Sequence, residues 1–129
     1  MRHTVLVIDD QWSMQELARI VLHTAGYRVL FASDAITGLC LARTEHPDLI
    51  VLDDHLTDQS GVGMLDQLRR APKTATIPVI IIATNATFPD AGNLASGMVS
   101  RYLRKPFHPP ELLHLVDHIV QHHELPIAV

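Results

Sequence analysis

The sequence has few of the residues that mark secreted, membrane or nucleic-acid-binding proteins. Its 129 residues include one cysteine, Cys40, so an internal disulfide is excluded and a reducing, cytoplasmic compartment is indicated. No apolar run reaches membrane-spanning length, and no secretory segment precedes the first apolar stretch. The formal net charge is -4, which argues against direct nucleic-acid binding. We therefore expect a soluble, cytoplasmic single domain with no membrane or nucleic-acid partner.

The apolar residues that are present follow two alternating patterns, typical of strands and helices. The predicted strands are Thr4–Ile8, Arg28–Ala32, Asp48–Asp53, Val79–Ile82 and Arg101–Arg104. The predicted helices are Ser13–Ala25, Ala35–Glu45, Val62–Ala71, a short one within Thr87–Ser100, and Pro109–His123. This alternation predicts an α/β fold with a parallel sheet and helices on both faces.

Helical spacing also predicts which side chains face the sheet. The expected inward residues are Met14, Leu17, Ala18, Val21, Ala25, Ile36, Leu39, Ala42, Leu65, Leu68, Leu112, Val116, Ile119 and Val120. Gly26 is expected to end the first helix, and Ser33 or Asp34 to cap the second. The one basic cluster, Arg69, Arg70 and Lys73, is interpreted as a solvated helix end.

Charged residues stand where three of the predicted strands end. Asp9 and Asp10 follow the first strand, Asp53 ends the central one, and Lys105 follows the last. The carboxyl ends of parallel strands form one crevice, which is where open α/β sheets bind ligands. Taken singly, an Asp-Asp pair is commonly a helix cap and Lys-Pro a loop. Chance explains their combination at successive strand ends much less well, so the combination indicates a functional site.

Crowded carboxylates repel one another and require a cation. Hard oxygen ligands with room for water suit Mg²⁺ held beside a phosphate, and Lys105 can pair with a phosphoryl oxygen. Once the charge is neutralised, a carboxylate can attack phosphorus and form an acyl phosphate. The chemistry therefore predicts a phosphorylated aspartate, with Asp53 as the candidate.

At this point the chain resembles the receiver domain of two-component response regulators. The motifs that carry the resemblance are Val7-Ile8-Asp9-Asp10, Pro47 through Asp53, Gly61, Pro78-Val79-Ile80, and Tyr102 through Phe107. The resemblance implies a flavodoxin-like (βα)5 sheet of strand order 2-1-3-4-5 and a cis bond between Lys105 and Pro106. It places a receiver domain at residues 1–124, with 125–129 as a tail or the start of a linker.

The resemblance also implies a function and its partners. Mg²⁺ would be held by Asp9, Asp10, Asp53 and the backbone carbonyl of His55. Asp53 would accept phosphate from a histidine kinase or phosphotransfer protein, and the domain would then change its binding to an output partner or to a further C-terminal output domain. Such a module takes part in its own phosphoryl transfer and is not a turnover enzyme on an external substrate.

One position departs from the family pattern. A Thr or Ser normally ends the fourth strand, where its hydroxyl bonds the phosphoryl group, but this chain has Ala83 there and Thr84 one place later. A one-residue offset turns a strand side chain to the other face. The aromatic partner of that hydroxyl, Tyr102, is still present. We therefore expect Asp53 to be phosphorylated, with a conformational change that is small or follows another route.

Two other functions remain open at this stage. A pseudo-receiver would act by phosphorylation-independent protein binding, which Ala83 favours and the intact acids oppose. A phosphatase of the haloacid-dehalogenase type would start from Asp53-Asp54-His55-Leu56-Thr57, one residue away from the Asp-x-Asp-x-Thr of that superfamily. Here His55 replaces the acid/base aspartate, and the strand is third in the chain rather than first.

The sequence also contains nine histidines, three of which recur every four residues. His114, His118 and His122 form one stripe along the last predicted helix. A metal could bridge an i, i+4 pair, although the stripe lies on the polar face and a solvated surface is favoured. His55 is different, because it adjoins the proposed phosphorylation site.

Overall fold

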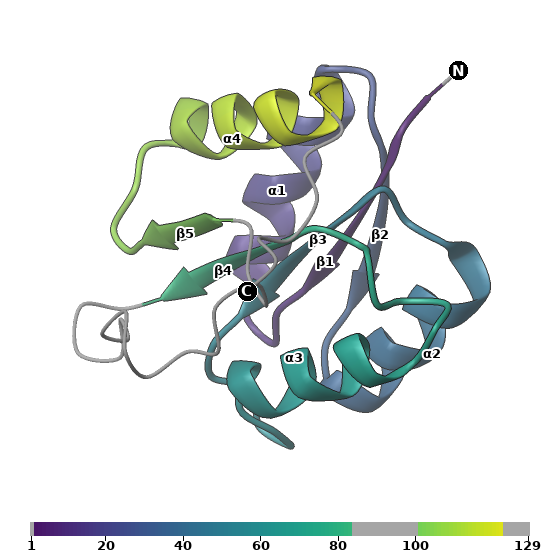
Figure 1. Ribbon diagram of the computed structural model, residues 1–129. Coiled ribbons are helices and arrows are strands. Elements are labelled where there is room, and N and C mark those ends of the chain that lie inside the picture. The colour runs from purple at the N-terminus through teal and green to yellow at the C-terminus, as the bar shows by residue number, and fades with distance from the viewer. Residues whose placement is uncertain (1, 84–100, 123–129) are drawn as a thin grey trace.

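The computed structural model describes residues 2–83 and 101–122, in which strands and helices alternate (Figure 1). The strands are β1 (Thr4–Ile8), β2 (Arg28–Ala32), β3 (Leu49–Asp53), β4 (Val79–Ala83) and β5 (Arg101–Arg104). The helices are α1 (Trp12–Thr24), α2 (Ala35–Glu45), α3 (Gly61–Arg70) and α4 (Pro109–Gln121). Each of these nine elements lies within two residues of its predicted bounds.

The five strands form one parallel sheet in the order β2-β1-β3-β4-β5. This is the flavodoxin-like order expected from the resemblance. The order reverses between β1 and β3, so the connections leave β1 and β3 toward opposite sides and open a crevice at their carboxyl ends. The cis peptide bond between Lys105 and Pro106 is also as expected.

Helices cover both faces of the sheet, which is why its central strands are apolar on both sides (Figure 1). Within β1, Leu6 and Ile8 pack in the core beneath α2 and α3, while Val5 and Val7 pack in the core beneath α1 and α4. All residues of β1, β3 and β4 are buried. This double burial fixes the strand register, because a slip by one residue would exchange the two cores.

Two helix ends form as predicted from their residue types. The Asp34 side chain accepts a hydrogen bond from the Thr37 amide at 2.7 Å and caps α2. Gly26 follows α1 with a φ of +99°, a left-handed conformation that a residue with a Cβ adopts at a cost. The chain therefore turns sharply into β2.

Two of the predicted inward residues are wrong. Ile36 is 74% exposed because the buried stripe of α2 lies on another side of the helix, and Ala25 is exposed because α1 ends at Thr24. In α2 the stripe runs through Ala35, Gly38, Leu39 and Ala42, and in α1 Leu22 is buried. Glycine lets α2 approach β1 closely, since a Cβ at Gly38 would lie 2.6 Å from Cδ1 of Ile8.

The interpretation of the basic cluster is wrong for Arg69. Its Nη1 donates hydrogen bonds to the carbonyls of Ile77 at 2.7 Å and Thr74 at 3.3 Å. Burial lowers the pKa of this guanidinium to about 10. Arg70, by contrast, is exposed and pairs with Asp66 at 2.9 Å. Arg69 therefore holds the connection between α3 and β4 by two hydrogen bonds to its backbone carbonyls.

The fourth predicted helix, within 87–100, and the tail 125–129 lie outside the described residues. In the part of the chain that is described, none of the helices combines the length and the apolar character needed to cross a bilayer.

The two neighbouring arginines make a matched pair of variants. Replacing Arg69 by Met leaves two loop carbonyls without their charged donor, so we expect the free energy of unfolding to fall by about 1–3 kcal/mol. Arg70→Met removes only an exposed ion pair and should cost less than about 1 kcal/mol. Urea unfolding measures both, and equal losses in the two variants would contradict the role given to Arg69.

Candidate functional site

Three carboxylates meet at the carboxyl ends of β1 and β3. Asp9 and Asp10 follow β1 directly, and Asp53 is the last residue of β3. Each offers an oxygen, and these oxygens lie within 4.8 Å of one another. Asp9 is 1% exposed and Asp53 5%, whereas Asp10 is exposed. The structure thus brings the three predicted acids together at the switch point of the sheet.

Hydrogen bonds from the chain just after β1 hold both the carboxylate and the backbone carbonyl of Asp9. The Gln11 amide donates to Oδ1 of Asp9 at 2.9 Å. The Gln15 side chain donates from Nε2 to the Asp9 carbonyl at 2.6 Å and to Oγ of Ser33 at 3.1 Å. Gln15 therefore links the turns after β1 and β2, and it fixes the backbone from which Asp9 and Asp10 project.

Among the ion pairs of the described residues, Asp53 has one cationic partner, Lys105. Its Nζ lies 4.0 Å from Oδ1 of Asp53, and the lysine side chain is 24% exposed. The backbone amide of Lys105 donates to the Ala83 carbonyl at 2.7 Å, which ties the turn after β5 to the end of β4. The His55 amide also approaches Oδ1 of Asp53, at 3.4 Å.

Burial dominates the electrostatics of the acids. Burial, and after it the nearby Asp9 carboxylate, raise the pKa of Asp53 to about 6, and Lys105 and the His55 amide offset only part of this rise. Burial also raises the pKa of Asp9, against the lowering effects of the Gln11 amide and Lys105. Two of the three acids are therefore poorly stabilised as anions by the protein alone.

The donor set fits Mg²⁺. Carboxylate oxygens are the hard ligands that Mg²⁺ binds, and a divalent cation offsets the mutual repulsion of three acids 4.8 Å apart or less. Magnesium keeps several water ligands, and the exposed position of Asp10 leaves the cluster open to solvent on one side. The family resemblance implies the backbone carbonyl of His55 as a fourth ligand, which remains a prediction.

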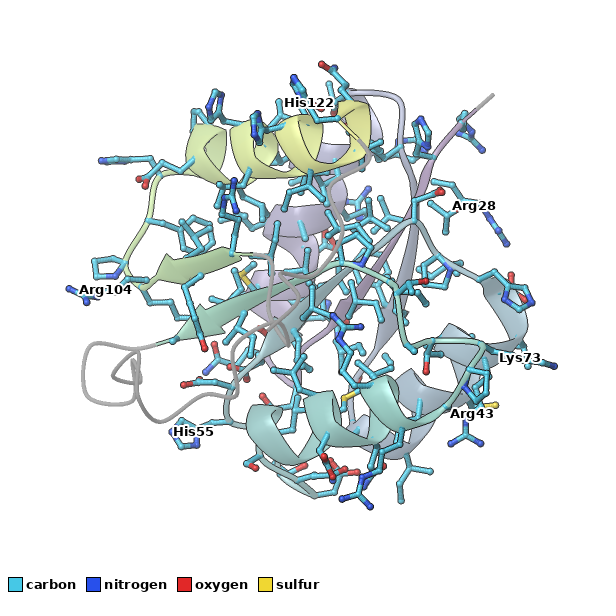
Figure 2. All side chains as sticks on the ribbon, in the orientation of Figure 1. Arg28, Arg43, His55, Lys73, Arg104 and His122 are labelled. Carbon is cyan, nitrogen blue, oxygen red and sulfur yellow. The ribbon has the colours of Figure 1, made fainter. Side chains whose placement is uncertain are left out.

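The loop after β3 is shaped by a glycine at its end. The Gly61 amide donates to the Asp54 carbonyl at 2.9 Å, and a Cβ at Gly61 would lie 2.8 Å from the Cα of Asp54. A side chain there would push directly on the backbone that carries Asp53. The His55 side chain points away from the body of the domain and is exposed (Figure 2).

Asp58 anchors the same loop to a second element. Its carboxylate accepts hydrogen bonds from the amides of Ala35 at 3.0 Å and Ile36 at 3.2 Å, at the N-terminus of α2. That position is favourable for an anion, since the first amides of a helix lack intrahelical acceptors. Sequence reasoning missed both Asp58 and Gln15, because nothing in a polar loop or a helix surface indicates a contact with a distant element.

The predicted switch positions are only partly described. Ala83 is fully buried at the end of β4, in register with Arg104 of β5, so no hydroxyl lies at this position. Burial raises the pKa of the Tyr102 hydroxyl to about 12. Thr84 lies outside the described residues, and its suggested part in switching stays a prediction.

Comparison with known proteins places these features in a family. The sequence model of the response regulator receiver domain matches residues 5–117. The DNA-binding dual master transcriptional regulator RpaA of Synechocystis is 38% identical over 109 residues, which cover 84% of this chain and 45% of RpaA. The chain thus spans about half the length of RpaA and of the transcriptional regulatory proteins PhoP of Bacillus subtilis and PhoB of Pseudomonas aeruginosa.

Solved structures agree with this match. The chemotaxis response regulator CheY4 of Vibrio cholerae superposes with a TM-score of 0.84 at 25% identity, over 92% of this chain and 99% of that one. The receiver domain of the sensor histidine kinase PA1611 from Pseudomonas aeruginosa gives 0.83 at 25% identity, over 94% and 99%. That domain was solved with a magnesium ion coordinated in its active-site cleft.

The raised pKa of Asp53 makes stability depend on pH. Its folded-state pKa of about 6 lies above the usual 3.8, because the folded protein disfavours the charged carboxylate. The contribution of Asp53 to the free energy of unfolding is therefore fully present below about pH 4 and is lost as the pH rises through 6. Asp53→Asn removes this penalty. Without Mg²⁺ the variant should be more stable than the native chain at about pH 7.5, by at most about 3 kcal/mol, with the excess vanishing near pH 4. Urea unfolding that shows a less stable variant at the higher pH would contradict the electrostatic account.

Two glycines in the first turn of α3 give a matched pair of variants. Both changes to alanine raise helix propensity, but only the one at Gly61 meets backbone atoms. Gly61→Ala forces a Cβ onto the Asp54 backbone, so we expect a loss of about 1–3 kcal/mol in stability and weaker Mg²⁺ binding. Gly63→Ala meets only the side chains of Gln59 and Ser60, at 3.1 Å and beyond, and should retain both properties. Unfolding and magnesium titration of the pair give the comparison, and equal behaviour would argue against the tight loop.

Proposed function

Because the chain belongs to the family of response regulator receiver domains, we propose that Asp53 is the phosphoacceptor of a two-component signalling module. Receiver domains are signalling modules, and family membership is shown by the match over residues 5–117. The observation that carries the proposal for Asp53 is its position. It ends the central strand, 95% buried, within 4.8 Å of two acids and 4.0 Å from the Lys105 ammonium. The module would take part in its own phosphorylation by an external donor and would not turn over an external substrate.

The phosphoryl transfer follows from these contacts. A carboxylate oxygen of Asp53 attacks phosphorus, the bond from phosphorus to the donor group breaks, and an acyl phosphate forms on Asp53. Mg²⁺, which we propose is held by Asp9, Asp10, Asp53 and the His55 carbonyl, would supply neutralising charge for the phosphoryl oxygens. Lys105 lies close enough to pair with one of those oxygens after transfer. Burial of Asp9 and Asp53 keeps these charge interactions strong by excluding water around them.

The donor and the output are proposed from the family. A histidine kinase or phosphotransfer protein would carry the phosphoryl group on an imidazole, which is a good leaving group for attack by a carboxylate. The relative RpaA is a transcriptional regulator about twice as long as this chain. The output is accordingly a partner protein or a further domain that reads the phosphorylated state. Residues 1–124 would form the receiver and 125–129 the tail or linker.

The direct test is phosphate uptake. Incubation with acetyl phosphate and Mg²⁺ should add one phosphoryl group to the native chain and none to Asp53→Asn, as measured by intact-protein mass spectrometry. Lys105→Met should be phosphorylated more slowly, since it removes the cation beside Asp53 while Asp53 itself remains. An unmodified native chain under these conditions would refute the proposal.

A pseudo-receiver is the second candidate, and Ala83 is the observation that favours it. The residue is buried at the end of β4 and offers no donor to a phosphoryl group. Native protein that stays unmodified and still binds its partner would identify this alternative. The phosphatase reading from Asp53-Asp54-His55 loses its basis, since the exposed imidazole of His55 points away from the domain (Figure 2).

Because Ala83 lacks a hydroxyl, we expect phosphorylation to cause only a small conformational change. One charge-assisted hydrogen bond contributes about 1.5–3 kcal/mol, and phosphorylation can shift a two-state equilibrium only by its differential interaction with the states. Ala83→Thr restores such a donor and should enlarge the phosphorylation-dependent change around Tyr102. Amide spectra of both proteins with and without beryllofluoride, a phosphoryl mimic, measure this change. A full shift in the native chain, with no gain in Ala83→Thr, would show that another group performs the switch.

A further inference from the structure

Three histidines lie along the outer surface of α4, away from the carboxylate cluster. His114, His118 and His122 recur at every fourth residue and are all exposed. Figure 2 shows His122 on the side of α4 that faces away from the sheet. The opposite side of the same helix packs into the core through Leu112, Val116, Ile119 and Val120. None of these imidazoles serves the core or the proposed phosphoacceptor site.

Two of the three imidazoles are already adjacent. The ring centroids of His118 and His122 are 4.5 Å apart, with the ring planes inclined at 34°. Solvated side chains one helical turn apart can diverge freely into water, so this proximity is not required by the helix. The pair presents two nitrogen-bearing rings at the spacing with which helical i, i+4 histidines chelate a metal ion.

The hydrogen bonding of His122 prepares its outer nitrogen for a metal. Nδ1 of His122 lies 2.9 Å from the carbonyl oxygen of His118. A carbonyl oxygen only accepts, so Nδ1 carries the proton and Nε2 carries the free lone pair. Metal-binding histidines commonly donate their second ring N–H to a backbone carbonyl in this way, which fixes the tautomer and the ring orientation.

The electrostatic surroundings also favour a cation. His118 lies in the last turn of α4 and His122 caps it, where the helix dipole and the final carbonyls are negative. Residues 109–121 contain no lysine or arginine that would repel an ion, and of their two acids Glu111 caps the opposite end of the helix. Asp117 accepts a hydrogen bond from the Tyr27 hydroxyl and so is held on the inner side.

We propose that His118 and His122 form a binding site for a divalent transition-metal ion of the zinc class, with Nε2 of His122 as one ligand and water in the remaining positions. Imidazole suits Zn²⁺, Cu²⁺ and Ni²⁺, whereas Mg²⁺ takes oxygen ligands. The two ends of the domain therefore select different ions. The acids select a hard cation, and the histidine pair selects a softer one that clamps the last turn of α4.

The test is Zn²⁺ titration calorimetry on tag-free protein, with excess Mg²⁺ present to occupy the acids. The native chain should bind one Zn²⁺. His118→Gln and His122→Gln should each weaken Zn²⁺ binding at least about tenfold. Removing a metal ligand lowers the affinity by at least as much as removing a group that only orients the ligand. His23→Gln is the matched control, because His23 is a single exposed histidine in the last turn of α1, and it should bind like the native chain.

Imidazole ¹⁵N spectra supply a readout that does not depend on heat. Zn²⁺ should shift Nε2 of His122 and one nitrogen of His118, while Nδ1 of His122 stays protonated. Absence of saturable binding, or native affinity in His118→Gln, would overturn the proposal. Native affinity in His122→Gln combined with loss in His118→Gln would also overturn it, because the ligands would then be His114 and His118.

Discussion

The burial of like charges at the carboxyl end of the sheet is the constraint on which the rest of this structure depends. Asp9 and Asp53 are almost wholly removed from water, and the exposed Asp10 lies within 4.8 Å of both. A single lysine at 4.0 Å does not offset their desolvation, so the pKa of Asp53 is raised to about 6. The cluster is consequently suited to a divalent cation, and we propose that a phosphoryl group is stabilised beside it.

The fold holds this unfavourable arrangement by fixing the backbone around it. The carboxyl ends of β1 and β3 are adjacent because both strands are buried on both faces and locked in register. Hydrogen bonds from Gln15, the contact of Gly61 with Asp54, and the anchoring of Asp58 to α2 then fix the loops. These three contacts hold the backbone around the cluster, whereas the Gln11 amide donates directly to a carboxylate oxygen, Oδ1 of Asp9.

Much of this organisation could be predicted from the sequence, since apolar runs that end in charge encode both the strands and the crevice. The meeting of Asp9, Asp10 and Asp53 followed from that pattern, and the strand order was implied by the family resemblance. The buried face of α2 could not be predicted well, because Gly38 is inward and Ile36 outward against simple hydrophobic ranking. Arg69, Asp58 and Gln15 were missed because each bonds an element that is remote or irregular in sequence.

Magnesium titration followed by Trp12 fluorescence tests the central claim most directly. Trp12 begins α1 two residues after Asp10 and is 74% exposed, so its emission should report ion binding at the acids. The account predicts a saturable change that Asp9→Asn with Asp10→Asn abolishes, and weaker binding as the pH falls below about 6, where protons compete for Asp53. A saturable change that survives the double substitution, or emission that stays flat while calorimetry shows no heat, would contradict it.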